Sequence, residues 1–150
     1  DGSLSDLQVP KTLLQKASTY CWDLDLATGS SQASKTFTSS YGKLRYEGEG
    51  LSKAGPLLLS PAEGHGGDPW SAAEEDRGRF AQVEPKDWHR MRYFAPAEVS
   101  ALMGYPSGWS LPEGLDVRSQ WRLIGNSVNV QVVRSVLKRL FSKLGAEDCR

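Results

Sequence analysis

The C-terminal part of the sequence constrains the fold most, because an amphipathic run follows a polar turn there. From residue 128 onwards, apolar residues recur at spacings of one, three and four, which is the period of one face of a helix. These residues are Val128, Val132, Val133, Val136, Leu137, Leu140, Phe141 and Leu144. The other face is cationic, with Arg134, Lys138, Arg139 and Lys143. The pattern predicts a helix whose apolar face docks against another part of a protein.

Gly125, Asn126 and Ser127 directly precede this run. Such residues form a tight turn, and the Asn and Ser side chains can cap the following helix. The exposed backbone N–H groups of the turn can equally hold a small molecule. From spacing alone, a helix cap and a ligand contact both stay open.

Three motifs occur in a fixed order before and through this turn. They read Arg92-Tyr93-Phe94-Ala95-Pro96-Ala97-Glu98-Val99, then Leu102-Met103-Gly104-Tyr105-Pro106, then Trp121-Arg122-Leu123-Ile124-Gly125-Asn126-Ser127. In order, spacing and residue type they resemble the last two conserved motifs of the cytosine-5 methyltransferases. Asn129 and the residue types of the three motifs are most similar to the branch of that family that methylates aspartate tRNA.

A second resemblance to this branch lies upstream, in its target-recognition signature. The residues are Thr36-Phe37-Thr38-Ser39-Ser40-Tyr41-Gly42, followed by Glu47-Gly48-Glu49-Gly50. Thr36 stands where the family has Cys, and the segment between Gly42 and Gly48 is one residue longer than in the family.

This segment mixes cations, hydroxyls and an aromatic ring, so we expect RNA contacts along it. Cations neutralise phosphates, hydroxyls bond to sugar or phosphate oxygens, and Tyr41 would stack on an unpaired base. The candidate residues are Lys35, Thr36, Thr38, Ser39, Ser40, Tyr41, Lys43 and Arg45. The alternative is an ordinary solvated hairpin edge.

The resemblance implies an α/β fold: the C-terminal part of a Rossmann-like S-adenosylmethionine-dependent methyltransferase with an irregular target-recognition region. Residues 1–88 would form the recognition region, with a mobile linker at 60–76, and residues 89–150 would return into the catalytic domain. The Pro10 and Pro96 positions predict helix starts, Gly104 a helix end, and residues 118–124 a further helix.

The family's glycine-rich cofactor loop, Pro-Cys nucleophile and Glu-Asn-Val motif belong to an N-terminal half, and the sequence contains none of them. Neither Cys21 nor Cys149 follows a proline or has metal-ligand spacing to another residue. We therefore predict no catalytic residue and no metal site, and we expect the chain alone to be inactive.

The family transfers a methyl group from S-adenosylmethionine to carbon 5 of cytosine, so the resemblance implies this cofactor. We expect Asn126, Ser127 and Val128 to contact it; the alternative is that Asn126 locks the turn and Ser127 caps the helix. Arg92 and Arg122 are candidate phosphate ligands, although for Arg92 we favour an internal strut between the recognition region and the catalytic domain.

The composition limits which kinds of partner and which cellular location we expect. The 150 residues carry a formal net charge of zero, so RNA binding would rely on local patches. No apolar run approaches the roughly 20 residues of a membrane span. Two cysteines without partners suit a reducing compartment, so we expect the cytoplasm, with the nucleus as a second location.

The predicted partners are tRNA and the N-terminal catalytic half of the same enzyme. Two alternatives stay open: a DNA cytosine-5 methyltransferase, and a non-catalytic nucleic-acid- or partner-binding module from a truncated isoform or a split subunit.

Overall fold

A small mixed sheet forms the centre of the computed structural model, which describes residues 4–20, 24–29, 31, 34, 36–43, 46–47, 51–52, 55–60 and 80–143. Strand β1 (Leu26–Ala27) runs parallel to β4 (Leu57–Leu59), and β4 runs antiparallel to β5 (Met91–Tyr93). Strands β2 (Tyr46–Glu47) and β3 (Leu51–Ser52) form a separate antiparallel pair. Since β5 follows residue 88 and its neighbours precede it, both predicted segments contribute to one sheet. The boundary itself stays a prediction.

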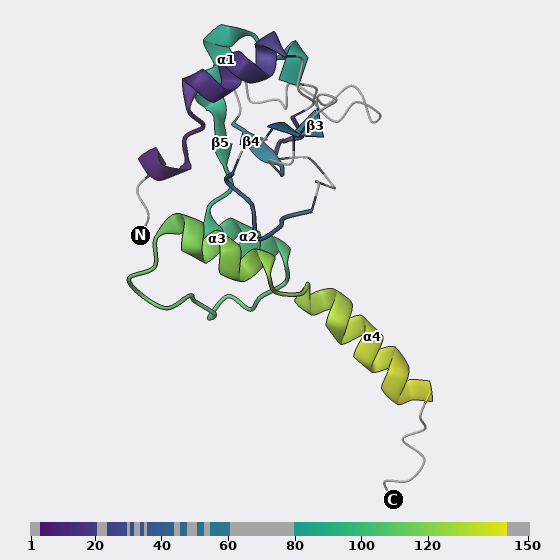
Figure 1. The fold of residues 1–150 in the computed structure, drawn as a ribbon. Coiled ribbons are helices and arrows are strands. Elements are labelled where there is room, and N and C mark those ends of the chain that lie inside the picture. Colours follow the sequence, from purple (N-terminus) through teal and green to yellow (C-terminus); the bar gives the residue numbers. More distant parts are fainter. Residues whose placement is uncertain are drawn as a thin grey trace, which may run out of the picture.

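The helices fall into groups that Figure 1 separates clearly. Helix α1 (Lys11–Thr19) lies beside the sheet, whereas α2 (Pro96–Leu102) and α3 (Val117–Gly125) pack against each other below it. The described residues also form the 3-10 turns η1 (Leu4–Leu7), η2 (Phe80–Gln82) and η3 (Pro85–Arg90). Helix α4 (Val130–Lys143) extends away from the rest of the molecule.

The core joins the sheet to the helices on either side of it. Leu57 on the central strand β4 and Met91 on the edge strand β5 are both fully buried. Leu14 of α1 packs into the same cluster, and so do Trp121 and Ile124 of α3. One face of α3 is therefore buried, as is typical of an amphipathic helix.

Proline and glycine set the helix ends largely as predicted. Pro10 caps α1 and Pro96 opens α2, where the missing N–H costs nothing. Gly104 ends α2 with a φ of +80°. Ala95 has no side-chain cap to offer, but the Glu98 carboxylate accepts a 2.7 Å hydrogen bond from its backbone N–H.

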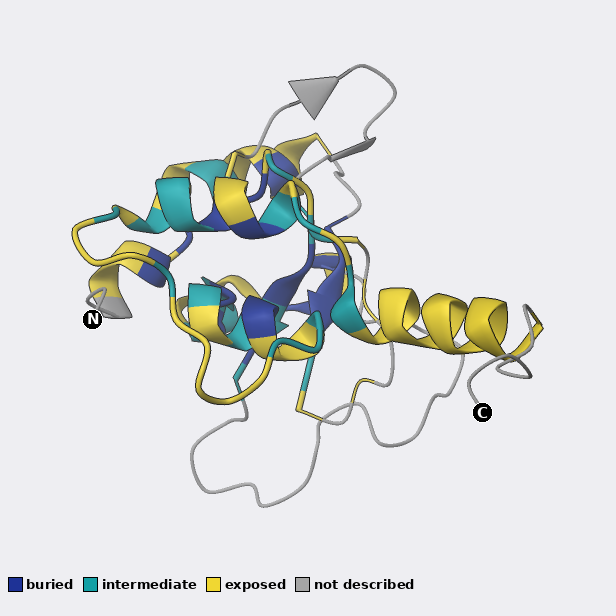
Figure 2. Cartoon of the chain, turned by 90° about the horizontal axis from the view of Figure 1, so that it is seen from below, coloured by how far each residue is buried: buried dark blue, intermediate teal, exposed yellow. Residues whose placement is uncertain are grey.

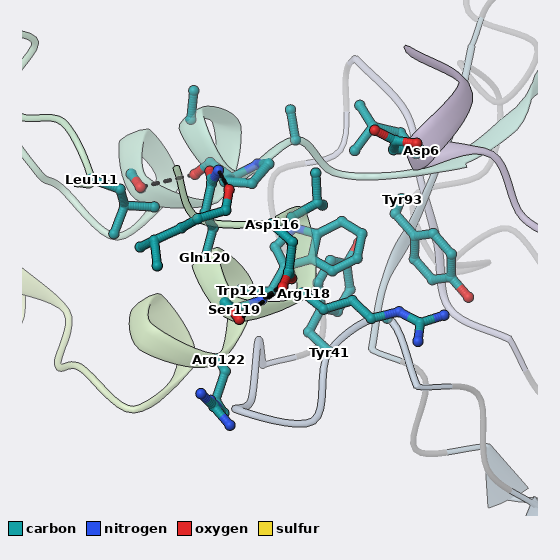
Figure 3. A pocket seen from close by; sticks show the side chains of 18 of the residues that line it. Asp6, Tyr41, Tyr93, Leu111, Asp116, Arg118, Ser119, Gln120, Trp121 and Arg122 are labelled. Carbon is teal, nitrogen blue, oxygen red and sulfur yellow. Dashed lines mark hydrogen bonds between the residues drawn. The ribbon is translucent and has the colours of Figure 1, made fainter. Parts of the chain in front are cut away.

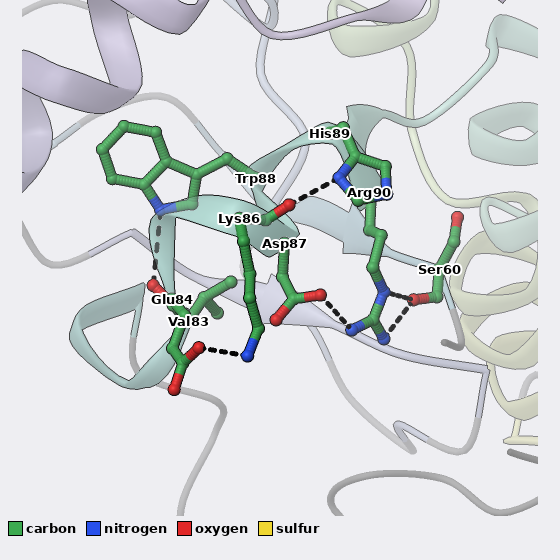
Figure 4. A network of polar contacts seen from close by, with 8 residues as sticks. All are labelled: Ser60, Val83, Glu84, Lys86, Asp87, Trp88, His89 and Arg90. Atoms are coloured by element: carbon green, nitrogen blue, oxygen red, sulfur yellow. Dashed lines mark hydrogen bonds and ion pairs between the residues drawn. The ribbon is translucent and has the colours of Figure 1, made fainter. Parts of the chain in front are cut away.

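A network of polar contacts anchors the segment that leads into β5 (Figure 4). The Arg90 guanidinium donates two hydrogen bonds to the Ser60 carbonyl, at 2.9 and 2.7 Å, and pairs with Asp87. The Trp88 indole donates to the Val83 carbonyl, and its ring stacks on Phe80 at 5.8 Å between centroids. These bonds fix the chain on both sides of residues 61–79. Apart from Ser60, the linker predicted at residues 60–76 lies outside the described residues.

The apolar face of α4 is exposed to solvent (Figure 2). No residue of this helix is buried, and Val132, Val136 and Phe141 are 59%, 59% and 63% exposed. The helix forms as predicted, but its predicted docking has no counterpart among the described residues. None of the helices in these residues is both long and apolar enough to cross a membrane.

Candidate functional site

The predicted recognition segment is a compact pair of turns at residues 36–43. The Tyr41 N–H donates to the Thr38 carbonyl at 2.9 Å, and the Lys43 N–H donates to the Ser40 carbonyl at 3.0 Å. Gly42 has a φ of +78°, which glycine adopts without strain and which turns the chain back towards the core.

Tyr41 is the anchor of this segment, and the prediction that it stacks on a base is wrong for this structure. Its side chain is only 3% exposed. The hydroxyl donates a 2.7 Å hydrogen bond to the Pro56 carbonyl and accepts a 2.8 Å bond from the Phe94 N–H. The ring meets Trp121 edge to face at 5.1 Å. Burial raises the pKa of the Tyr41 phenol, so it stays protonated and keeps both bonds.

The other described members of the predicted RNA-contacting set are accessible to a ligand. Thr36, Thr38, Ser40 and Lys43 are exposed, and Ser39 is half-buried. Lys35 and Arg45 lie outside the described residues. Inward anchoring by Tyr41 thus leaves hydroxyls and one cation on the outer side of the segment.

Asn126, Ser127 and Val128 link α3 to α4. Asn126 caps the C-terminus of α3 through its backbone, while its exposed carboxamide makes no hydrogen bond to a described residue. The Ser127 hydroxyl donates to the Ile124 carbonyl, and Val128 is 62% exposed. The cap of α4 is Asn129, whose Oδ1 accepts from the N–H groups of residues 131 and 132 at 3.0 and 3.1 Å. Neither Asn126 nor Ser127 is therefore needed to cap α4.

Arg92 is an internal strut rather than a phosphate ligand. Its guanidinium makes a bidentate pair with Glu98, at 2.8 and 2.7 Å, and donates to the Tyr93 carbonyl. These bonds join β5 to the first turn of α2. The hydrogen bonds from Arg92 hold the pKa of Glu98 below its usual value. Arg92 thus acts as a local strut between β5 and α2, whereas the predicted strut between the recognition region and the catalytic domain stays a prediction.

An open groove of about 1950 Å³ runs between the N-terminal segment, α2, α3 and the loop at residues 105–116 (Figure 3). Arg118 and Arg122 line it, one helical turn apart on α3, and Lys43 lines it from the recognition segment. All three cations are exposed and form no ion pair with a described residue. Arg118 extends towards Tyr93, whose pKa burial raises to about 12.

Sequence reasoning missed Arg118, although its spacing of four from Arg122 places the two on one helix face. The groove also has acidic lining residues, so its charge is mixed. Asp116 is one of them, and its carboxylate caps α3 by accepting from the Ser119 N–H at 2.7 Å. That hydrogen bond lowers the pKa of Asp116.

Comparisons with known proteins agree on one family. A sequence model described as C-5 cytosine-specific DNA methylase matches residues 11–142. A mouse tRNA (cytosine(38)-C(5))-methyltransferase is 30% identical over 99% of this chain and 34% of its own length. A Dictyostelium discoideum DNA (cytosine-5)-methyltransferase is 42% identical over 35% of the chain and 14% of its own length.

A solved structure shares the arrangement as well. The crystal structure of the S. pombe Dnmt2 methyltransferase superposes with a TM-score of 0.65 at 25% identity, and the match covers 96% of this chain and 40% of that one. The chain therefore spans about a third of the length of the curated tRNA-methylating relative above.

Proposed function

Because the chain belongs to the C-5 cytosine-specific DNA methylase family, we propose that it is the C-terminal portion of a tRNA (cytosine-5) methyltransferase. The complete enzyme would methylate an anticodon-loop cytosine of aspartate tRNA, and this portion would be inactive by itself. One observation carries the proposal. The segment resembling the tRNA-methylating signature, residues 36–43, is held against α3 beside the Gly-Asn-Ser turn, and its Thr36, Thr38 and Ser40 are exposed.

In this family S-adenosylmethionine supplies the methyl group that cytosine carbon 5 accepts after a cysteine thiolate adds to carbon 6. The thiolate would come from the N-terminal half, because this sequence has no Pro-Cys motif. The role of the present chain is then to hold the RNA and to complete the wall of the cofactor pocket.

The residues of the turn fit such a wall. The Asn126 carboxamide has no described hydrogen-bond partner, so its donors and acceptor are available to a ligand. Val128 exposes an apolar surface that a ligand could cover. Since the Ser127 hydroxyl already donates to Ile124, we expect Ser127 to contact the cofactor only as an acceptor, for example from a ribose hydroxyl.

The RNA would cross the outer side of the recognition segment and the cationic rim of the groove. Lys43, Arg118 and Arg122 form no ion pair with a described residue, which suits phosphate binding. Arg118 also interacts with the Asp116 carboxylate at longer range. Thr36, Thr38 and Ser40 would bond to sugar or phosphate oxygens. Residues other than Tyr41 would stack on the RNA bases, because Tyr41 is buried.

The exposed apolar face of α4 fits the N-terminal catalytic half as its partner. Leu137 and Leu140 are 43% and 47% exposed, which leaves a hydrophobic seam without cover. The relatives are about three times as long as this chain, so a covering surface has ample sequence to come from. We place the complete enzyme in the cytoplasm, or in the cytoplasm and nucleus.

Duplex DNA is the second candidate substrate, because one relative with a matching segment is named a DNA methyltransferase. The remaining alternative is that the chain belongs to a non-catalytic module. Methyl transfer by the complete protein would exclude this alternative.

Labelled methyl transfer tests the substrate. The complete enzyme should label an aspartate tRNA transcript carrying cytosine 38, which is the position that the tRNA-methylating relatives are named for. A transcript with uridine at that position should lose the label. Equal labelling of both transcripts would overturn the proposed target.

A further inference from the structure

The backbone conformation at residue 125 does not explain why this residue is a glycine. It is the last residue of α3, and the described glycines with positive φ are Gly42, Gly55, Gly104 and Gly114. A helix end without a positive φ accepts any L residue. Another physical reason must therefore favour glycine at this position.

The reason is the close approach of the recognition segment. A Cβ on Gly125 would lie 2.3 Å from the Thr38 carbonyl carbon, 2.4 Å from the Thr38 oxygen and 2.5 Å from the Ser39 nitrogen. All three are backbone atoms, so no side-chain rotation relieves the overlap. The backbone of the recognition segment rests directly on the first residue of the Gly-Asn-Ser turn.

A second close contact, with a buried side chain, lies one turn earlier on α3. A Cβ on Gly42 would lie 2.5 Å from the Trp121 ring, against which Tyr41 also packs. The segment thus touches α3 at two points, each of which needs a glycine. Its position is set by α3 rather than by its own turns alone.

We propose that Gly125 is a positioning residue: through its contact with Thr38 and Ser39, the RNA-recognition segment and the cofactor turn hold each other in place. This inference rests on the proposed function, which assigns RNA to one side of the contact and S-adenosylmethionine to the other. Asn126 and Val128 follow the contact by one and three residues, so a shift of the segment displaces the turn directly.

The contact makes the two binding events interdependent. RNA that fixes the exposed hydroxyls of the segment also fixes the turn, so the cofactor then binds to a site that is already ordered. By linkage, each ligand raises the affinity of the other by the same factor. We expect a factor of about 5 or more, at the lower end of typical couplings.

Calorimetry on the complete enzyme measures this factor. The dissociation constant of S-adenosylhomocysteine, the demethylated cofactor, is determined without and with saturating aspartate tRNA, so the readout needs no turnover. In the unaltered enzyme tRNA should tighten binding about 5-fold or more. In Gly125→Ala the ratio should fall towards one.

Gly108→Ala is the matched control. A Cβ on Gly108 meets nothing within 4 Å, and its φ is not positive. This variant should keep the coupling of the unaltered enzyme. A folded Gly125→Ala enzyme with the same coupling as Gly108→Ala would overturn the proposal.

Hydrogen exchange on the unaltered enzyme decides the matter if Gly125→Ala does not fold. S-adenosylhomocysteine alone should slow exchange at the amides of Tyr41 and Lys43, which donate within the segment. Unchanged exchange there, with the cofactor bound, would contradict the inference. Slowed exchange in an enzyme that rejects tRNA would leave the contact standing and overturn only the proposed substrate.

Discussion

Removing one oxygen atom from Tyr41 isolates the anchor of the recognition segment. In Tyr41→Phe the ring keeps its contacts with Trp121 and Phe37, while the hydroxyl that joins Pro56 to Phe94 is lost. A buried carbonyl and a buried N–H then lack their partner. Each such group costs about 1–3 kcal/mol, so for the two groups we expect a loss of about 2–6 kcal/mol in the free energy of unfolding.

The melting temperature of the complete enzyme reports this loss. Unfolding entropy is about 2 cal/mol/K per residue, so each kcal/mol corresponds to about 1 °C in a protein of about 450 residues, three times this chain. Tyr41→Phe should therefore lower the melting temperature by about 2–6 °C if the enzyme unfolds as a unit.

Tyr93→Phe is the matched control, because Tyr93 is 4% exposed and packs on the same cluster. Its hydroxyl makes no hydrogen bond to a described residue, so its loss should shift the melting temperature by less than about 1 °C. Equal shifts in the two variants would refute the reasoning that the Tyr41 hydroxyl ties the segment to β5.

Further predictions concern the terminal helix, the strut and the cationic rim. Leu137→Asp should destabilise the complete enzyme by several kcal/mol if α4 docks, whereas Ser135→Asp should not; equal melting temperatures would show an undocked face. Glu98→Gln should cost about 1–2 kcal/mol at pH 7, since its pair is partly exposed. Because the folded pKa of Glu98 is lowered, that cost should fade as the pH drops through it, and a pH-independent difference would count against the strut. Replacing Lys43 and Arg122 by Ala should make the slope of log tRNA affinity against log salt shallower by up to about 1.4; an unchanged slope would remove both from the interface.

Local signals in the sequence predicted the helices well. Pro10, Pro96 and Gly104 act through the backbone of their own residues, so no distant partner is needed to read them. The helix after residue 128 follows from the period of its apolar residues, and the helix predicted at 118–124 is also present. The motif resemblance supplied the family, which the matching family model confirms.

The orientation of side chains depended on distant partners and was harder to predict. Tyr41 stands among cations and hydroxyls in the sequence, yet Phe94, its hydrogen-bond partner, is 53 residues away. A single aromatic ring in a polar segment can point either way, and only the fold decides. Gly125 is a similar case, since its neighbour Thr38 is even more distant in sequence and a turn alone also explains a glycine.

The choice between tRNA and DNA tests the central claim most directly. The complete enzyme is given labelled S-adenosylmethionine with equimolar aspartate tRNA and cytosine-containing duplex DNA, at one fixed salt concentration, because phosphate contacts make both affinities salt-dependent. The account predicts that the label enters the tRNA and that excess duplex DNA reduces this labelling little. Label that enters the duplex DNA in preference to the tRNA would contradict it.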